Sequence, residues 1–277
     1  MGLRKPYIKQ EFALESKGAA LRTNYVREKI KRGEPSLGCF MGLGSPNLAE
    51  LLSHAGFEWL VVETEHNGLD SAEIEHMLMA IKGTDAIPLV RIPAASPVYI
   101  QRALDVGAMG IVVPLVRTAS EAEAIVRATR YPPQGTRSFG ALRAANYTFD
   151  NLDYFYRAND NLLLMLILET REAIANLDAI AAVPGVDALM FGFYDLCLSF
   201  GLDPMKQPHA EIDAMVERAL ALSKRTGVAI GATANTPDGL RGLMQAGYKM
   251  LAYGPDYALM VNAVRPGVAA YREETAR

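Results

Sequence analysis

The chain has 277 residues, half of them hydrophobic, and a net charge of −3. This length suits one large domain. A slightly negative net charge argues against a protein that binds nucleic acid or an anionic membrane surface, because such proteins carry a basic patch. Two cysteines, Cys39 and Cys197, cannot build a disulfide framework and have no zinc-site spacing, which favours a reduced, cytoplasmic setting. No run of about 18 apolar residues exists, so we expect no membrane span.

Short apolar runs alternate with longer amphipathic stretches along the chain. We expect residues 1–34 to form a tail and an extra helix, the helix near residues 18–32. Eight apolar runs then predict buried parallel strands at residues 37–42, 58–63, 87–92, 110–114, 161–169, 187–192, 228–232 and 249–254. Helices are predicted to begin near Pro46, Ser71, Pro97, Ser120, Arg171, Ala210, Pro237 and Pro255.

The strand and helix order predicts the fold class. Eight strand–helix units within about 240 residues favour a closed α/β (β/α)₈ TIM barrel over a doubly wound sheet. We therefore expect residues 35–277 to form a single catalytic barrel domain. Residues 131–160 carry no predicted helix or strand, and so long a loop in a compact domain is usually functional.

Charged side chains follow several predicted strands. The carboxyl ends of barrel strands meet at one mouth, where the chemistry of such enzymes lies. Charged groups at the end of an apolar strand are costly unless they have a use. The residues at these positions are Glu63, Glu65, His66, Arg91, Glu169, Asp195 and Asp256.

Two of these carboxylates predict a metal site. Glu169 and Asp195 follow neighbouring strands, so they can supply half of the ligands of a hard divalent cation. Water and the carboxylate and keto oxygens of a 2-oxo acid can supply the others. The alternative is that both carboxylates form ion pairs with arginines at the mouth.

Arg91 and His66 are candidates for the chemistry itself. Arg91 can hydrogen-bond a keto oxygen and stabilise an enolate, or it can form a structural ion pair with Glu63 or Glu65. His66, oriented by either glutamate, can serve as a general base, directly or through a water.

The lysine positions bear on how the site could activate a carbonyl substrate. A Schiff-base aldolase needs a lysine in its pocket. None of the nine lysines follows a predicted strand at the mouth, which favours metal-stabilised enolate chemistry instead. They are Lys5, Lys9, Lys17, Lys29, Lys31, Lys82, Lys206, Lys224 and Lys249.

Several short motifs carry a resemblance to a known family. Individually they are weak, but their order and spacing are specific. They are Glu-Thr-Glu-His at 63–66, Val-Arg-Ile-Pro at 90–93, Leu-Asp-Val-Gly-Ala at 104–108, Arg-Tyr-Pro-Pro at 130–133, Gly-Thr-Arg at 135–137, Glu-Thr-Arg-Glu-Ala at 169–173 and Asp-Leu at 195–196. From about Pro35 to the last helix, the chain resembles the class II pyruvate aldolases of the HpcH/HpaI family, in the phosphoenolpyruvate/pyruvate-binding barrel group.

The resemblance implies roles for these residues. Glu169 and Asp195 would bind Mg²⁺ or Mn²⁺, with Co²⁺ also able to serve. Arg91 would contact the keto oxygen, and His66 would serve acid–base chemistry with Glu63 in the place of the family's aspartate.

Two further residues and the assembly also follow from the resemblance. Glu65 and Asp105 would support the site without touching the substrate. Alternatively, Asp105 would act at the site of a neighbouring subunit. Backbone amides at residues 193–195 would hold the pyruvate carboxylate. The resemblance implies a hexamer whose last helix is exchanged between subunits.

The chain also departs from the family pattern. Ile167 replaces a glutamine, and Phe193 and Tyr194 replace small residues. With Phe40 at the end of the first strand, these residues predict a narrower, more aromatic mouth and a substrate partner of low polarity. The alternative is that the rings face outward or into a subunit interface.

The expected reaction joins or separates pyruvate, or a related 2-oxo acid, and an aldehyde as a 4-hydroxy-2-oxo acid. A metal-dependent decarboxylase or acylpyruvate hydrolase would use the same enolate-stabilising site. A CoA-ester lyase of the citrate-lyase type shares the fold but should need a basic channel for the nucleotide. A catalytically silent ligand-binding barrel is a further alternative, which the presence of Glu169, Asp195, Arg91 and His66 disfavours.

Overall fold

The computed structural model describes residues 21–206 and 209–276. Its eight strands are parallel and pair in chain order, and β1 also pairs with β8, which closes the barrel. The (β/α)₈ barrel is therefore confirmed, and each strand lies within two residues of its predicted bounds. The strands are β1 (Ser36–Met41), β2 (Trp59–Glu63), β3 (Ile87–Arg91), β4 (Gly110–Val113), β5 (Leu163–Leu168), β6 (Ala188–Phe191), β7 (Ala229–Ala234) and β8 (Met250–Tyr253).

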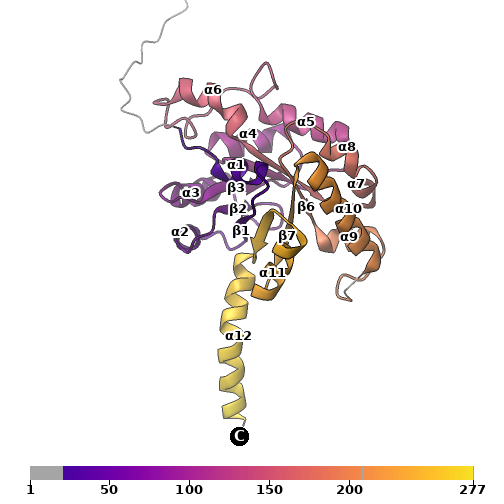
Figure 1. The fold of residues 1–277 in the computed structure, drawn as a ribbon. Coiled ribbons are helices and arrows are strands. Elements are labelled where there is room, and N and C mark those ends of the chain that lie inside the picture. Colours follow the sequence, from indigo (N-terminus) through magenta and orange to yellow (C-terminus); the bar gives the residue numbers. More distant parts are fainter. Residues whose placement is uncertain (1–20, 207–208, 277) are drawn as a thin grey trace, which may run out of the picture.

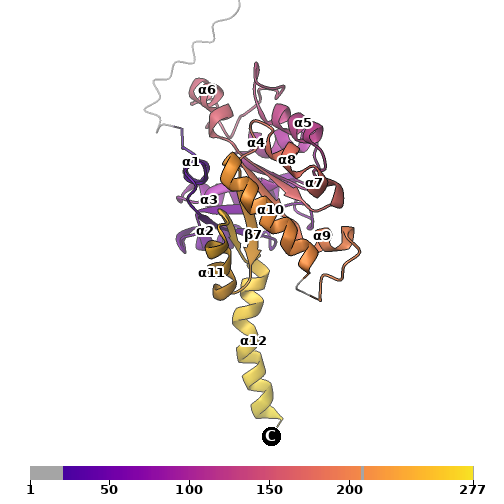
Figure 2. The same ribbon diagram turned by 45° about the vertical axis from the view of Figure 1, so that its right-hand side comes forward.

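Helices surround the barrel (Figures 1 and 2). Several begin where the sequence signals predict, because a side chain caps the first turn: Asp70 and Thr118 each form a capping box with the glutamate three residues later. The helices are α1 (Tyr25–Lys31), α2 (Pro46–His54), α3 (Ser71–Lys82), α4 (Pro97–Asp105), α5 (Ala119–Thr129), α6 (Asn151–Asn161), α7 (Arg171–Ala175), α8 (Leu177–Ala181), α9 (Phe193–Ser199), α10 (Ala210–Thr226), α11 (Pro237–Ala246) and α12 (Asp256–Thr275).

The barrel interior determines which strand residues reach the mouth. Side chains alternate across a strand, and the inner cluster contains Val61 of β2, Leu89 of β3 and Ile167 of β5. The residues two positions further along face the same way, and these are Glu63, Arg91 and Glu169. At the opposite end, Val26 and Ile30 of α1 belong to the inner cluster, so α1 covers the N-terminal opening of the barrel.

The expectation that residues 131–160 form no regular element was wrong. Helix α6 occupies Asn151–Asn161. It packs through Tyr154 and Ala158, one turn apart, against Tyr131 in a small separate cluster. Its other positions are mostly polar, so the apolar stripe was too weak to indicate a helix.

Three smaller differences concern helix bounds. The extra helix α1 begins at Tyr25 rather than near residue 18, and the tail predicted before residue 18 lies outside the described part of the chain. The helix predicted from Arg171 is two helices separated at Asn176. A short helix, α9, follows Gly192 where no helix was predicted.

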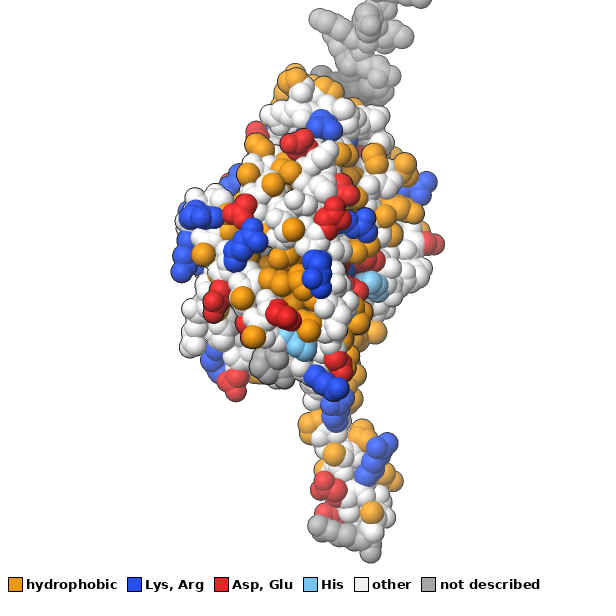
Figure 3. All heavy atoms as spheres, turned by 90° about the vertical axis from the view of Figure 1, so that its right-hand side faces the viewer, with side chains coloured by type: hydrophobic (Ala, Val, Ile, Leu, Met, Phe, Trp, Pro, Cys, Tyr) orange, Lys and Arg blue, Asp and Glu red, His pale blue; other side chains and the backbone are white. Residues whose placement is uncertain are grey.

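Helix α12 projects away from the barrel (Figures 1 and 2). Asp256 is buried at its start, and every residue from Met260 to Ala276 is exposed. Figure 3 shows hydrophobic side chains among the charged ones along this projection. Neither α12 nor any other helix in the described residues is long and apolar enough to cross a lipid bilayer.

Candidate active site at the barrel mouth

The ends of β2 and β3 bring Glu63 and Arg91 together. The two residues are register partners on adjacent strands, and Arg91 Nη1 lies 3.1 Å from Glu63 Oε2. The second oxygen of Glu63 accepts hydrogen bonds from the backbone N–H groups of Glu65 at 2.7 Å and His66 at 3.3 Å. Glu63 therefore fixes both the guanidinium of Arg91 and the turn that carries Glu65 and His66.

His66 reaches solvent from this turn. Its side chain is 61 % exposed, and Nε2 lies 3.5 Å from Glu65 Oε2. The other ion pair of Glu65 is with Nη2 of Arg91. Of the two glutamates expected to orient His66, Glu65 faces the imidazole and Glu63 holds the backbone.

Glu169 continues the inward face of β5 and is almost completely buried. Its Oε1 accepts a 2.7 Å hydrogen bond from the backbone N–H of Leu115, a residue held at φ 57°. Its Oε2 lies 3.9 Å from Arg91 Nη2. A Cβ atom at position 192 would lie 2.3 Å from this Oε2, so Gly192 leaves the space that the carboxylate fills.

Asp195 lies in the first turn of α9, three residues after Gly192. Its side chain is exposed, and its charge raises the pKa of both Glu65 and Glu169. Asp195 is therefore within electrostatic range of both glutamates. Among the described residues, Glu63, Glu65 and Glu169 thus lie within 4.0 Å of the Arg91 guanidinium, and Asp195 adds its charge to this group.

Burial opposes ionisation of two of these groups. Burial is the main cause that raises the pKa of Glu169, against the lowering effects of the Leu115 N–H and of Arg91. Burial likewise raises the pKa of Glu65, and Arg91 lowers it in part. Excess negative charge in a partly dehydrated site is the condition that a bound cation relieves.

The remaining predicted pocket residues lie in different surroundings. Ile167 is buried in the barrel interior below Glu169, and Phe40 packs against the same inner cluster. Phe193 packs against the outer core between barrel and helices. Tyr194 contacts Phe193 edge to face and is 55 % exposed, so it is the ring of this pair that is open to a ligand.

Asp105 does not reach the mouth of its own barrel. It ends α4 on the N-terminal side and forms a 2.7 Å ion pair with Arg137. Within one chain the structure therefore places Asp105 apart from Arg91 and Glu169. A role toward a neighbouring subunit stays a prediction.

Asp256, which follows the last strand, has a structural setting. Its carboxylate accepts hydrogen bonds from the backbone N–H groups of Gly42, Leu43 and Tyr257. It joins the end of β1 to the start of α12. The sequence could not predict this structural role, because the position of Asp256 after a strand does not reveal which backbone amides lie near its carboxylate.

No described lysine forms an ion pair with a mouth carboxylate. Lys29 pairs with Glu58, and Lys82 donates to Asn146. Lys249 lies just before β8, on the N-terminal side. The other described lysines, Lys31, Lys206 and Lys224, form no ion pair with the mouth carboxylates; Lys5, Lys9 and Lys17 fall outside the described residues.

Comparison with known proteins gives a consistent set of relatives. A family model described as HpcH/HpaI aldolase/citrate lyase matches residues 36–263. The chain is 39 % identical over 236 residues to a 2-dehydro-3,6-dideoxy-6-sulfogluconate aldolase from Pseudomonas putida, covering 84 % of this chain and 91 % of the relative. It is 36 % identical over 254 residues to a hydroxypyruvate/pyruvate aldolase from Roseovarius nubinhibens, covering 91 % and 98 %.

A solved structure agrees over nearly the same region. It is that of an HpcH/HpaI aldolase/citrate lyase family protein from Burkholderia cenocepacia. The TM-score is 0.85 at 33 % identity, and the match covers 90 % of this chain and all of the other. The family model, over residues 36–263, includes all eight strands that form the mouth.

Proposed function

The chain belongs to the HpcH/HpaI aldolase/citrate lyase family, and from this premise we propose that it is a class II aldolase, a lyase that uses a divalent metal. Its substrates are pyruvate, or a related 2-oxo acid, and an aldehyde, which it joins as a 4-hydroxy-2-oxo acid or releases from one. The observation that carries the proposal is the ion group of Glu63, Glu65, Arg91 and Glu169.

The donor set fits a hard cation. Glu169 Oε2 faces the space above Gly192, and the nearby charge of Asp195 adds a second carboxylate. Within residues 21–206 and 209–276, no three His, Cys, Asp or Glu side chains are arranged to hold a metal alone. Glu169 and Asp195 would therefore be completed by water and the 2-oxo acid, and oxygen ligands favour Mg²⁺ or Mn²⁺, with Co²⁺ also able to serve.

The cation, when bound, would act as a Lewis acid toward the keto oxygen. Arg91 would donate to the same oxygen; what supports this is that its Nε is buried and has no hydrogen-bond partner among the described residues. As the bond between C3 and C4 of the hydroxy acid breaks, its electron pair forms the enolate, whose negative charge Arg91 stabilises. Glu63 keeps the guanidinium in place through the 3.1 Å contact.

His66 is the group that moves the proton. Its exposed imidazole can remove the proton of the C4 hydroxyl, directly or through a water, so that the aldehyde leaves. Glu65, 3.5 Å from Nε2, stabilises the imidazolium that results. Proton return to C3 of the enolate completes pyruvate.

The substrate partner is proposed to be of low polarity. Ile167 lies directly below Glu169 on the inward face of β5 and offers no hydrogen bond, and Phe40 packs against the same inner cluster. With the exposed ring of Tyr194, these side chains suit an aromatic or short aliphatic aldehyde, or an oxo acid with an apolar branch. Phe193 packs against the outer core instead and is not one of these side chains.

The assembly is proposed to be a hexamer in which α12 packs on a neighbouring subunit. What supports this is the exposure of its apolar side chains, which include Val261, Val264 and Val268. An exposed apolar stripe of this kind is typical of an interface. A cytoplasmic location is also part of the proposal, because Cys39 and Cys197 are both buried and free.

The test is an aldol screen with pyruvate and hydroxypyruvate against aliphatic, aromatic and sugar-acid aldehydes, with added Mg²⁺, Mn²⁺ or Co²⁺ and with none. We expect metal-dependent product with at least one aldehyde. Pyruvate release from oxaloacetate is measured in parallel. Release from oxaloacetate with no aldol product from any aldehyde would favour the decarboxylase instead.

A further inference from the structure

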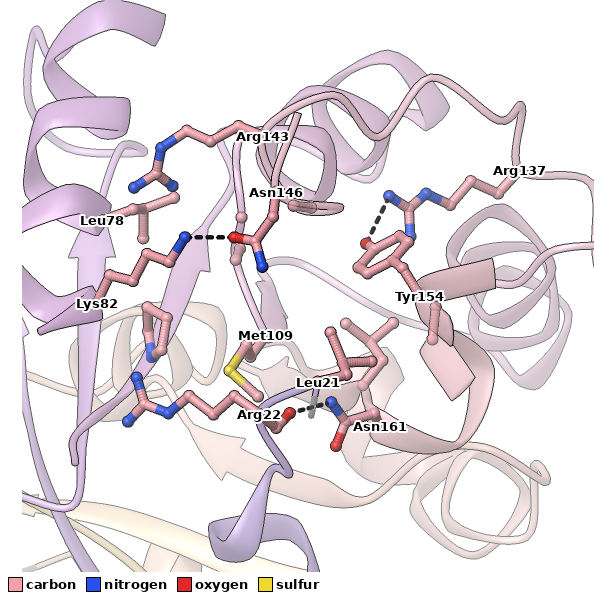
Figure 4. Close-up of a pocket in the computed structure, with 16 residues that line it drawn as sticks. Leu21, Arg22, Leu78, Lys82, Met109, Arg137, Arg143, Asn146, Tyr154 and Asn161 are labelled. Atoms are coloured by element: carbon pink, nitrogen blue, oxygen red, sulfur yellow. Dashed lines mark hydrogen bonds between the residues drawn. The ribbon is translucent and has the colours of Figure 1, made fainter. Parts of the chain in front are cut away.

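A second cavity lies on the opposite face of the barrel from the proposed active site. It has a volume of about 220 Å³ and is shown in Figure 4. Pro88 lies near the start of β3, Met109 just before β4 and Leu162 just before β5. All three are at the N-terminal ends of their strands, whereas Arg91 ends β3 at the mouth.

Four cationic side chains line this cavity. They come from segments far apart in the sequence: Arg22 precedes α1, Lys82 ends α3, and Arg137 and Arg143 lie in the loop before α6. Such convergence on one concavity produces a local positive potential in a chain whose net charge is −3.

Only part of this charge is neutralised by the protein. Arg137 forms a 2.7 Å ion pair with Asp105, and Arg143 forms a looser one with Glu75 at 3.5 Å. Lys82 Nζ donates to the amide oxygen of Asn146, and Arg22 donates to the backbone carbonyl of Ala86. Neither Lys82 nor Arg22 has a carboxylate within 4.0 Å among the residues that the structure describes.

The rest of the lining is largely apolar. Figure 4 places the thioether of Met109 near the centre of the cavity, with Leu21 beside it and Leu78 on the side of Lys82 and Arg143. Ala108, Ala158 and Leu162 also line it. An apolar wall with a few charged groups at its edge is the usual composition of a small-molecule site.

We propose that this cavity binds a small organic acid, with its apolar body against Met109 and Leu78 and its carboxylate or phosphate beside Lys82 and Arg143. Ammonium and guanidinium groups both form strong charge-assisted hydrogen bonds to such oxyanions. The volume is below the 300 Å³ or so of a site for a drug-sized ligand, which favours a small acid over a nucleotide. The inference does not depend on the proposed aldolase activity.

Calorimetric titration of the metal-free full chain tests the proposal. The probes are benzoate, phenyl phosphate and inorganic phosphate. Their affinities show separately what the carboxylate, the phosphate and the phenyl ring contribute to binding. We expect saturable binding of benzoate or phenyl phosphate with one site per chain, and at least tenfold weaker binding of inorganic phosphate.

Variants then locate the binding. Lys82→Gln should weaken it about tenfold, the loss of one charge-assisted contact, and Lys82→Arg should restore most of it. Lys224→Gln, an exposed lysine on α10, is the matched control and should change nothing. The proposal is overturned by absence of saturable binding, by equal effects of Lys82→Gln and Lys224→Gln, or by loss of binding in Arg91→Ala, which would put the probe at the mouth.

Discussion

Arg91 lies 3.1 Å from Glu63 where β2 and β3 end side by side. This contact holds a guanidinium at the point where the enolate charge of the proposed reaction develops. Arg91 also lies within 4.0 Å of two further mouth carboxylates, those of Glu65 and Glu169.

Replacing Arg91 with alanine should lower kcat by roughly 10²–10³, the usual effect of removing an oxyanion donor. Metal affinity should be kept or increased, because a positive charge beside the carboxylates is lost. Arg91→Lys should recover little, since an ammonium does not reproduce the paired contacts of the guanidinium. Steady-state kinetics at saturating Mg²⁺ and metal titration measure the two effects separately; near-normal kcat in Arg91→Ala would remove this residue from the mechanism.

Gly192→Ala should displace the side chain of Glu169. The added Cβ would lie 2.3 Å from Oε2 and 2.8 Å from the Cβ of Glu169, so the carboxylate and the adjoining backbone at the end of β5 must move, and metal affinity should fall at least tenfold. The matched control is Gly242→Ala on α11, where nothing lies within 4 Å of the added atom and where alanine favours the helix. Metal titration and thermal unfolding of both variants check this, and equal metal affinity in the two would contradict it.

The raised pKa values of Glu65 and Glu169 predict the pH dependence of stability in the metal-free protein. Folding raises the pKa of each group above its ordinary value of 4.5, so the folded chain holds the protons more tightly than the unfolded chain. Their contribution to the free energy of unfolding is therefore fully present at a pH below the ordinary pKa. It is lost as the pH rises through the raised pKa values of the folded chain.

Glu169→Gln should consequently raise the Tm of the metal-free protein by a few degrees at neutral pH, and the gain should vanish toward pH 4. Glutamine keeps an oxygen that can accept from the Leu115 N–H. Glu123→Gln, an exposed position on α5, should leave the Tm unchanged at both pH values. A Glu169→Gln variant that is less stable than wild type at neutral pH would show that burial is not the dominant cause of the shift.

Light scattering should show an oligomer, with a hexamer as the expected mass. Val264 and Val268 of α12 are 54 % and 46 % exposed, and replacing both with glutamate should dissociate the assembly into smaller species. Arg265→Gln, a polar change on the same helix, should leave it intact. A wild-type monomer at micromolar concentration would reject the exchange of α12.

The sequence predicted the mouth well because the relevant signal is local. Glu63, Arg91 and Glu169 each end an apolar run, and the alternation of side chains along a strand carries them to the inside of the barrel. The resemblance to a family then assigned their roles. The same reasoning selected Asp256, whose position after a strand looks identical, although its carboxylate serves backbone amides.

Other features depend on neighbours that the sequence does not reveal. Leu115 adopts φ 57°, and a leucine gives no local sign of a left-handed backbone. The need for Gly192 comes from Glu169, which is distant in the sequence. Helix α6 is held by tertiary contacts of Tyr154 and Ala158 rather than by a continuous apolar stripe.

The most direct test of the account is the exchange of the methyl protons of pyruvate with deuterium, followed by NMR. This half-reaction needs the enolate but no aldehyde. We predict exchange with the Mg²⁺- or Mn²⁺-loaded protein, its loss on exhaustive chelation, its recovery when metal is added back, and no covalent trapping on a lysine by borohydride. Exchange that persists without metal together with borohydride trapping, or no exchange of pyruvate or hydroxypyruvate in the metal-loaded protein, would contradict the proposed mechanism.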